Sequence, residues 1–261
     1  LFYTMLDPTN LLLMLLSITY DYLMAFLILK AKKDVSMRKL PMMACVLKNL
    51  ALVLVFGLQQ EIFHIAMPLG LMVYSLTSMG YVIDVYRGQT AAQKSFAKLL
   101  LYVSLFPQLI AGPIVRYVDV EAEISSRTVT ADDFFSGTVR FTQGLVKKVI
   151  FANFAGSAVD TLIGGDMGRL SALGAWVGIL FFSLQIYFDF SGYSDMAIGL
   201  GRMLGFDFLD NFNYPYLSRS ATEFWRRWHI SLGNWFRDYM YIPLGGNRVN
   251  KGRLIFNLLI V

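Results

Sequence analysis

Long apolar runs with few charged residues are the feature that most limits what this chain can fold into. The clearest of them are residues 10–29, 41–58, 65–86 and 171–190. A run of about 20 apolar residues is long enough to cross the hydrocarbon core of a bilayer as a helix. Hydrophobic residues make up 56% of the 261 residues and charged residues only 16%, which is rare in a soluble domain of this length. We therefore predict an all-α fold, a polytopic transmembrane helical bundle.

Basic residues gather between these runs and predict how the chain crosses the membrane. The segment after the first run holds Lys30, Lys32, Lys33, Arg38 and Lys39. An excess of Lys and Arg is typical of cytoplasmic loops, so this segment and the basic region 202–253 are placed there, and residues 59–64 form a short external loop that holds His64. The net charge of +5 is therefore interpreted as an orientation signal, and no nucleic-acid partner is expected.

The segment 99–115 is apolar but carries Pro107, Gly112 and Pro113. Proline removes a backbone hydrogen bond from a helix and kinks or breaks it. Irregular backbone at membrane depth is tolerated only where protein or a water-filled cavity satisfies its polar groups. We therefore expect a broken or re-entrant element that lines a cavity.

Three further elements are expected after this break. Residues 134–148 are interpreted as an amphipathic helix that lies on the membrane surface. Residues 149–163 and 171–190 are interpreted as two more crossings, joined by a glycine-rich turn at 164–168. The chain as a whole is expected to form one membrane-embedded domain, residues 1–261.

Two carboxylates, Asp189 and Asp195, lie in an otherwise apolar stretch. On insertion scales a carboxylate at the centre of a transmembrane helix costs about 2.5–3.5 kcal/mol, so each needs a compensating partner. Ser191, Asp195 and Gly199 recur every four residues and form one small, polar stripe. The stripe favours either close helix packing, with Asp195 bonding across the interface, or a polar surface that contacts substrate.

The stretch from Ser220 to Asp238 holds one of only two histidines, His229. Ser220 followed by Glu223 is typical of a capped helix start, and the pattern predicts an amphipathic helix over 221–240. His229 falls at the edge of an aromatic arc on this helix, and Gly233, four residues later, leaves room in front of the imidazole. His229 is therefore either a ligand-facing residue or a core histidine bonded to a neighbouring helix.

Several motifs together resemble the membrane-bound O-acyltransferase family. They are Pro68–Tyr74, Tyr81–Arg87, Phe106–Ile114, Tyr187–Gly201, Asn211–Tyr216, Thr222–His229 and Leu244–Arg248. The resemblance covers about residues 65–253. Within the family the chain is similar to the bacterial branch that O-acetylates alginate, and the enzymes that transfer D-alanine to teichoic acid are near neighbours.

The resemblance implies an enzyme of the bacterial inner membrane that moves an acyl group, most simply acetyl, from a cytoplasmic thioester donor toward hydroxyls of an exported polysaccharide such as alginate. The donor would be acetyl-CoA or an acyl carrier protein, and the partners would include periplasmic acetyltransferases, the polysaccharide and the lipid bilayer. No bound cofactor is expected, and no metal, since no cluster of metal ligands is present. The single cysteine, Cys45, excludes a disulfide framework.

The resemblance also implies site residues. His229 matches the family position that holds Asn or His and is the candidate catalytic residue. The candidates for lining the substrate tunnel are Trp225, Trp228, Asp195, Ser191, Asn213, Arg226 and Arg237. The arginines are interpreted either as contacts for donor phosphates or as interfacial anchors.

The family's second catalytic histidine belongs to a later Trp-His-Gly motif, which this sequence does not contain. His64 matches no family position. We therefore expect that the chain is truncated before that histidine and is inactive alone.

An alternative of another class is a transporter or channel subunit, because broken helices and intramembrane carboxylates also mark those proteins. Transporters are typically built from paired internal repeats. We find no such repeat here, which favours the acyltransferase.

We predict that residues 30–40 and 245–253 face the cytoplasm and that residues 59–64 face the opposite side. Single cysteines in a Cys45→Ala background, labelled from each side with a membrane-impermeant thiol reagent, measure this. Labelling of a cysteine at position 35 from the periplasmic side would contradict the assignment.

Overall fold

The chain folds into helices joined by loops, and the computed structural model describes residues 2–31, 35–164 and 170–260. No strand occurs among these residues, so the predicted all-α fold is confirmed. Most of the turn expected at 164–168, and Lys32 and Lys33 of the basic segment, lie outside the described residues. The chain divides into two compact units. The expectation of a single domain stays a prediction.

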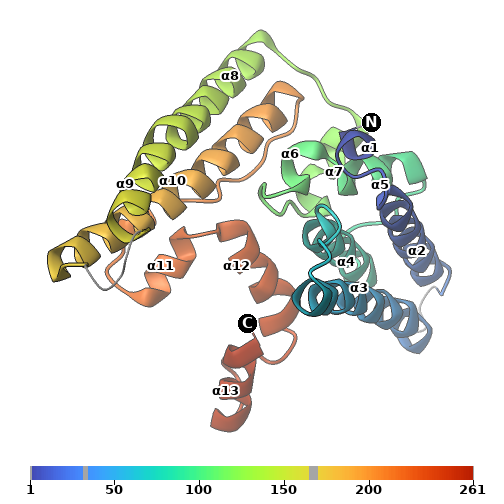
Figure 1. Cartoon of the computed structure of the whole chain (residues 1–261). Coiled ribbons are helices and arrows are strands. Elements are labelled where there is room, and N and C mark those ends of the chain that lie inside the picture. The colour runs from blue at the N-terminus through green and yellow to red at the C-terminus, as the bar shows by residue number, and fades with distance from the viewer. Residues whose placement is uncertain (1, 32–34, 165–169, 261) are drawn as a thin grey trace. The chain divides into compact units, whose positions relative to one another are not determined.

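The first unit comprises Leu1–Ile110, Ile114–Arg127 and Ile230–Val261. Its helices are α1 (Phe2–Leu6), α2 (Leu11–Lys30), α3 (Val35–Phe63), α4 (Leu71–Arg87), α5 (Phe96–Val103), α6 (Phe106–Leu109), α7 (Tyr117–Ser125), α12 (Ile230–Phe236), a π-helical turn η4 (Arg237–Tyr241) and α13 (Lys251–Ile260) (Figure 1). The second unit comprises Ala111–Pro113 and Thr128–His229. It holds α8 (Ala131–Val146), a π-helical segment η1 (Lys147–Ala152), α9 (Asn153–Ile163), α10 (Ala172–Met203), a 3₁₀ turn η3 (Pro215–Leu217) and α11 (Ala221–Arg227).

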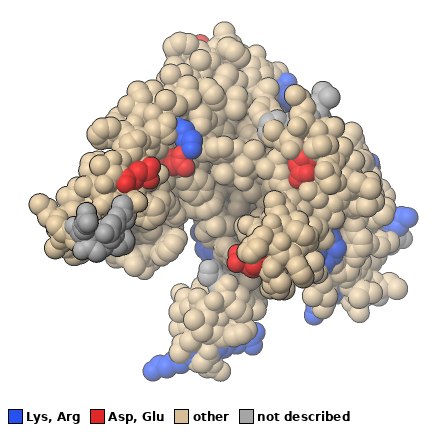
Figure 2. Space-filling view, viewed as in Figure 1, with Lys and Arg blue, Asp and Glu red and all other residues tan. Residues whose placement is uncertain are grey.

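Three described helices are long and apolar enough to cross a membrane. They cover Leu11–Lys30, Ser36–Phe63 and Ala172–Met203, with mean hydropathies of 2.0, 1.9 and 1.5. Each exposes large apolar side chains, among them Leu12, Leu16, Leu47, Leu54, Trp176 and Leu180. Charged residues are scattered over the face drawn in Figure 2, most of which is uncharged. Outward-facing leucine stripes of this length fit lipid, so the chain is a membrane protein.

Two sequence-based boundaries in the first unit were wrong. Residues 59–63 continue α3 as helix, because Gln59, Gln60 and Glu61 are good helix formers, and the loop begins only at His64, whose φ is 54°. The crossing expected over 65–86 begins at Leu71 and has 17 residues, so it is not among the candidate membrane spans.

A buried ion pair joins α2, α3 and α4. The Asp21 carboxylate is 0% exposed and lies 2.8 Å from the Lys48 ammonium. Ser78 donates to the same carboxylate at 2.6 Å, and the Asn49 amide donates at 3.2 Å. The charge inside the first apolar run is thus compensated by one residue from α4 and two from α3, which ties the three helices together.

The broken element predicted over 99–115 is confirmed. Helix α5 ends at Val103, α6 occupies only Phe106–Leu109, and no helix resumes before Tyr117. Buried side chains replace the missing backbone bonds: the Gln108 amide donates to the Tyr102 carbonyl at 2.7 Å, and the Tyr102 hydroxyl donates to the Val115 carbonyl at 2.8 Å. Protein groups therefore satisfy the irregular backbone here.

The division expected between a helix over 134–148 and a separate crossing over 149–163 was wrong, and the placement of residues 134–148 on the membrane surface stays a prediction. Helical backbone runs from Ala131 through η1 to Ile163, since Lys147 and Ala152 both keep right-handed helical angles. No proline interrupts this stretch, and Thr130 caps its start by accepting from the Asp133 amide at 3.1 Å. This long helix packs along α10 (Figure 1).

Glycines bring α8 and α10 into backbone contact. A Cβ atom on Gly144 would lie 2.5 Å from the Gly192 carbonyl oxygen, and one on Gly199 would lie 2.5 Å from the Phe141 amide nitrogen. The small stripe of α10 thus packs directly against α8. The close-packing interpretation of the stripe is confirmed.

Ion pairs with residues of α8 and η1 neutralise the two carboxylates of α10. Asp195 accepts from Arg140 at 2.7 Å and from Lys147 at 2.5 Å. Lys148 pairs with Asp189. Asp195 is 6% exposed, so its pairing partners supply the compensation that its burial requires.

We predict that Gly144→Ala destabilises the second unit, because the added methyl group meets backbone atoms that have no room to shift. Overpacking of this kind costs about 1–3 kcal/mol. Gly57→Ala is the matched control, since a Cβ there meets only the Met67 methyl at 3.9 Å. Thermal unfolding in detergent should show a lower transition for Gly144→Ala alone. Equal transitions for the two variants would show that the glycine contact is not needed.

Candidate functional site

His229 lies at a break between two helices. Helix α11 starts as predicted, with the Ser220 side chain accepting from the Glu223 amide at 3.1 Å. It ends at Arg227: Trp228 is extended, with φ −103° and ψ 128°, and His229 has a φ of 44°. The continuous helix expected over 221–240 was therefore wrong. Gly233 consequently does not follow His229 along one helix face. The prediction that Gly233 leaves room in front of the imidazole therefore no longer holds.

The left-handed backbone at His229 is a strained position. A non-glycine residue with positive φ costs about 1–3 kcal/mol and persists only where the surroundings hold it. The described chain has only two other such residues, His64 and Tyr214. Strained residues of this kind cluster at functional sites, so the break itself supports a role for His229.

Asn211 holds the His229 ring. His229 Nδ1 lies 3.1 Å from Asn211 Oδ1, and the Asn211 amide nitrogen donates to Ser194 Oγ on α10 at 3.1 Å. Asn211 and Ser194 are each 1% exposed. The Phe190 ring, also on α10, meets the imidazole edge-on with ring centroids 4.8 Å apart. Helix α10 therefore positions His229 both directly and through Asn211.

Burial keeps His229 neutral. Desolvation lowers the pKa of His229 from 6.5 to about 4, because the buried ring is poorly solvated as a cation. With Asn211 Oδ1 as its neighbour, Nδ1 carries the proton and donates it as a hydrogen bond. Nε2 then keeps a free lone pair, which can accept a hydrogen bond from a substrate hydroxyl.

An aromatic cluster surrounds Trp228. Its ring contacts Phe224 at 5.6 Å in a stacked arrangement and Phe212 at 5.0 Å edge-on. The other members are Tyr187, Phe190 and Tyr216. Phe190 also touches His229, so this cluster forms an apolar wall beside the imidazole. Trp225, by contrast, is 65% exposed and contacts Phe224 from outside the cluster.

The remaining sequence candidates each have surroundings of their own. Asp195 is taken up by Arg140 and Lys147, and Ser191 is buried with its hydroxyl unpartnered among the described residues. Arg226 is exposed, and Arg237 belongs to the first unit, where it pairs with Asp238. The described residues contain no group of three or more acidic, His or Cys side chains placed to hold a metal ion.

Asn211 is the residue that the sequence reasoning missed. The motif Asn211–Tyr216 offers two asparagines, and Asn213 was chosen, yet its side chain is exposed and its backbone amide donates to the Arg227 carbonyl at 2.9 Å. Both residues lie in an irregular loop, where no periodic pattern tells which side chain points inward. Only the fold shows that Asn211 is the buried one.

Comparison with known proteins gives a consistent set of relatives. Residues 89–261 match the model of MBOAT, the membrane-bound O-acyltransferase family. The chain is 48% identical over 206 residues to the probable alginate O-acetylase AlgI of Pseudomonas aeruginosa, covering 78% of this chain and 39% of that protein. It is 35% identical to the peptidoglycan O-acetyltransferase of Helicobacter pylori, over 77% of this chain and 43% of that protein.

A more distant relative is the teichoic acid D-alanyltransferase of Bacillus subtilis, at 29% identity over 67% of this chain and 45% of that protein. The chain thus spans about two fifths of the length of the relatives it matches.

We predict that His229 makes stability depend on pH. Its pKa in the folded state, about 4, is below its unfolded value of 6.5, so the unfolded chain binds more protons between these values. The contribution of His229 to the free energy of unfolding is intact above pH 6.5 and falls as the pH drops toward 4. At pH 5 this contribution is smaller by about 2 kcal/mol. Thermal unfolding in detergent at pH 7 and pH 5 should show a larger loss for the wild type than for His229→Gln. An equal loss in both would show that the ring is not desolvated.

Proposed function

Because the chain belongs to the membrane-bound O-acyltransferase family, we propose that it forms part of an enzyme that transfers acetyl groups to hydroxyls of an exported polysaccharide such as alginate. The names of the relatives describe O-acetylation of alginate, O-acetylation of peptidoglycan and D-alanylation of teichoic acid. An acetyl group is favoured over D-alanine because identity is 48% to the alginate enzyme and 29% to the D-alanyl enzyme.

The observation that carries this proposal is the neutral, anchored imidazole of His229. Acyl transfer to a sugar requires that a poorly acidic hydroxyl lose its proton as its oxygen attacks the acyl carbonyl. A free Nε2 lone pair can accept the hydrogen bond of that hydroxyl and direct its oxygen. The aromatic cluster on the other side of the ring excludes water, which competes as an acyl acceptor.

The pKa of His229 decides which part of this chemistry it performs. A general base works best with a pKa near the working pH, whereas the pKa of His229 is about 4. Holding a full proton would cost it about 3 kcal/mol more than an ordinary histidine. His229 therefore orients the hydroxyl, and the full proton goes to a second base, which the family resemblance assigns to a histidine of a later Trp-His-Gly motif.

The overall reaction needs an activated acyl donor. In the proposed reaction a cytoplasmic thioester, acetyl-CoA or an acetylated carrier protein, supplies the group: the carbon–sulfur bond breaks, the ester bond forms, and the thiol takes the proton from the hydroxyl. An inner-membrane location and periplasmic partner proteins belong to the same proposal. The transporter alternative receives no support, because the chain matches an acyltransferase family over residues 89–261.

We predict that His229→Ala in the whole protein lowers acetylation of the polysaccharide by at least about tenfold, since the attacking hydroxyl loses the hydrogen bond that orients it and a misplacement of about 1 Å can cost about 10²-fold. His229→Asn should retain more activity, because its amide can still bond a hydroxyl and the family position accepts Asn. Acetyl content of the polymer and the amount of protein in the membrane are the measurements. Normal acetylation in His229→Ala would return His229 to the role of a core histidine.

Asn211 and Asn213 form a matched pair for testing how His229 is held. We expect Asn211→Ala to lower acetylation by about tenfold, because the buried ring loses the acceptor that fixes its tautomer. Asn213→Ala should have a smaller effect, since that side chain is exposed. The reverse order of effects in the same acetylation assay would reinstate Asn213 as the site residue.

A further inference from the structure

A cavity in the first unit lies among residues that no part of the proposed chemistry uses. Its volume is about 560 Å³. Its walls come from the end of α4, the start of α7 and the π-helical turn η4: Arg87, Gln89, Arg116, Asp238, Tyr239, Ile242 and Pro243. Polar groups line one part, while Ile242 and Pro243 supply an apolar part. A cavity of this size holds a ligand larger than a single ion.

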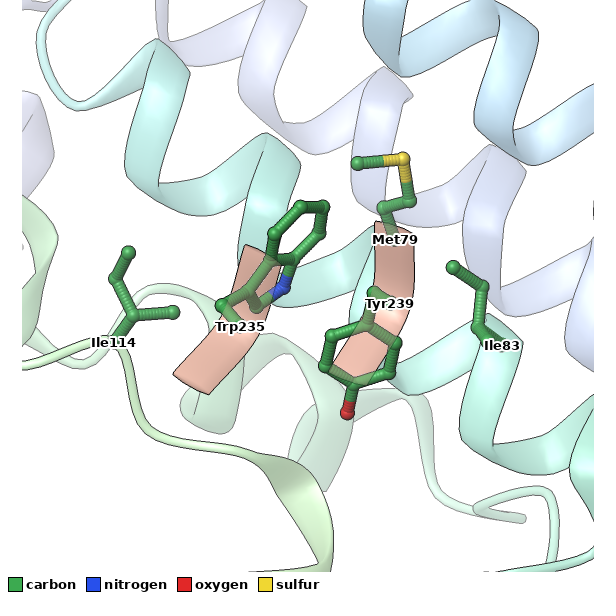
Figure 3. Close-up of a cluster of buried hydrophobic side chains, with 5 residues drawn as sticks. All are labelled: Met79, Ile83, Ile114, Trp235 and Tyr239. Atoms are coloured by element: carbon green, nitrogen blue, oxygen red, sulfur yellow. The ribbon is translucent and has the colours of Figure 1, made fainter. Parts of the chain in front are cut away.

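Buried packing fixes the floor of this cavity. Tyr239 is 7% exposed and lies in a cluster with Met79, Ile83, Ile114 and Trp235 (Figure 3). Its hydroxyl donates to the fully buried Asp84 carboxylate at 2.7 Å. The Trp235 indole donates to the Leu76 carbonyl at 3.1 Å. The ring of Tyr239 is therefore held from both sides and does not rely on a ligand for its position.

Arg87 rests on this floor without a direct ion-pair partner among the described residues. Its guanidinium carbon lies 5.2 Å from the centre of the Tyr239 ring, and one nitrogen donates to the Asp238 carbonyl at 2.9 Å. No carboxylate lies within ion-pair distance of Arg87 in the part of the chain that the structure describes. A guanidinium has five donors, so most of those on Arg87 are open to a ligand.

The other charges around the cavity largely cancel. Asp119 accepts from Arg116 at 3.0 Å, and this bond raises the pKa of Arg116. Asp238 lies 3.3 Å from Arg116 and 2.8 Å from Arg237. Arg116 and Arg237 thus face two carboxylates, while Arg87 faces Asp84 beneath the floor, whose negative charge is weakened because burial raises the pKa of its carboxyl. The carboxylates also hold Arg116 in place beside Arg87.

We propose that this cavity binds a phosphate group carried by a larger organic molecule. Arginine forks match the oxygens of phosphate, and the planar guanidinium of Arg87, stacked on Tyr239, is fixed in advance. Gln89 adds a neutral donor, and Ile242 and Pro243 face the organic part. Two sources share this chemistry, a phosphorylated nucleotide cofactor and the headgroup of an anionic phospholipid. The site does not depend on the role of His229.

The experiment uses the whole protein in lipid nanodiscs. Coenzyme A is the nucleotide probe, titrated calorimetrically in phosphatidylcholine discs. Phosphatidylglycerol is the lipid probe, counted by native mass spectrometry after release from mixed discs. Arg87→Gln removes the guanidinium and its positive charge. Arg253→Gln is the matched control, because it removes the same charge from an exposed position on α13.

We expect Arg87→Gln to weaken binding of one probe by about tenfold or more, since hydrogen bonds to charged groups contribute about 1.5–3 kcal/mol. Arg253→Gln should leave it unchanged. If Arg87→Gln fails to fold, Ile242→Trp fills the cavity from a side chain that is 58% exposed and tests the same site.

Loss of coenzyme A binding identifies the nucleotide as the source, and loss of retained phosphatidylglycerol identifies the lipid. Equal binding of both probes by Arg87→Gln, Ile242→Trp and the control would overturn the proposal. Failure of the His229 variants to affect acetylation would leave it standing, because none of these measurements reads activity.

Discussion

The cost of placing charge in apolar surroundings governs how this protein is built. Its long helices present leucines outward, yet they carry Asp21, Asp189 and Asp195. Each of these carboxylates is paired with a cation from a different helical element: Lys48 on α3, Lys148 on η1, and Arg140 together with Lys147. Such pairs add little net stability over apolar packing, but breaking one leaves an uncompensated charge. They therefore fix which helices lie together and in what register.

Glycine packing and ion pairing act together on α10. Gly192 and Gly199 let the backbone of α8 approach closely, and the ion pairs at Asp195 set the register. The faces of α10 that α8 leaves free carry Ser194 and Phe190, and these two residues contact Asn211 and His229. Rigid support of this kind is what a candidate catalytic side chain needs, because small errors in its position cost much of its effect.

The break at His229 turns a generic aromatic helix into a candidate site. In a continuous helix the imidazole would share the face of its neighbours. The extended Trp228 and the left-handed His229 instead bring the ring against Asn211 and Phe190. Desolvation there keeps the imidazole neutral, and Asn211 sets its tautomer. Strain in the backbone is thereby coupled to a defined hydrogen-bonding state of the side chain.

The sequence alone determined the features that depend on local pattern. Apolar runs gave the helical membrane class, Pro107 and Pro113 gave the broken element, Ser220 gave the start of α11, and the four-residue spacing through Asp195 gave the packing stripe. Only the tertiary structure decided that residues 131–163 form one helical run, that the chain breaks at His229, and that Asn211 rather than Asn213 holds its ring. The break at His229 and the choice of Asn211 depend on contacts between residues 17 or more positions apart, such as Asn211 with Ser194 and His229, and a local pattern carries no record of such contacts.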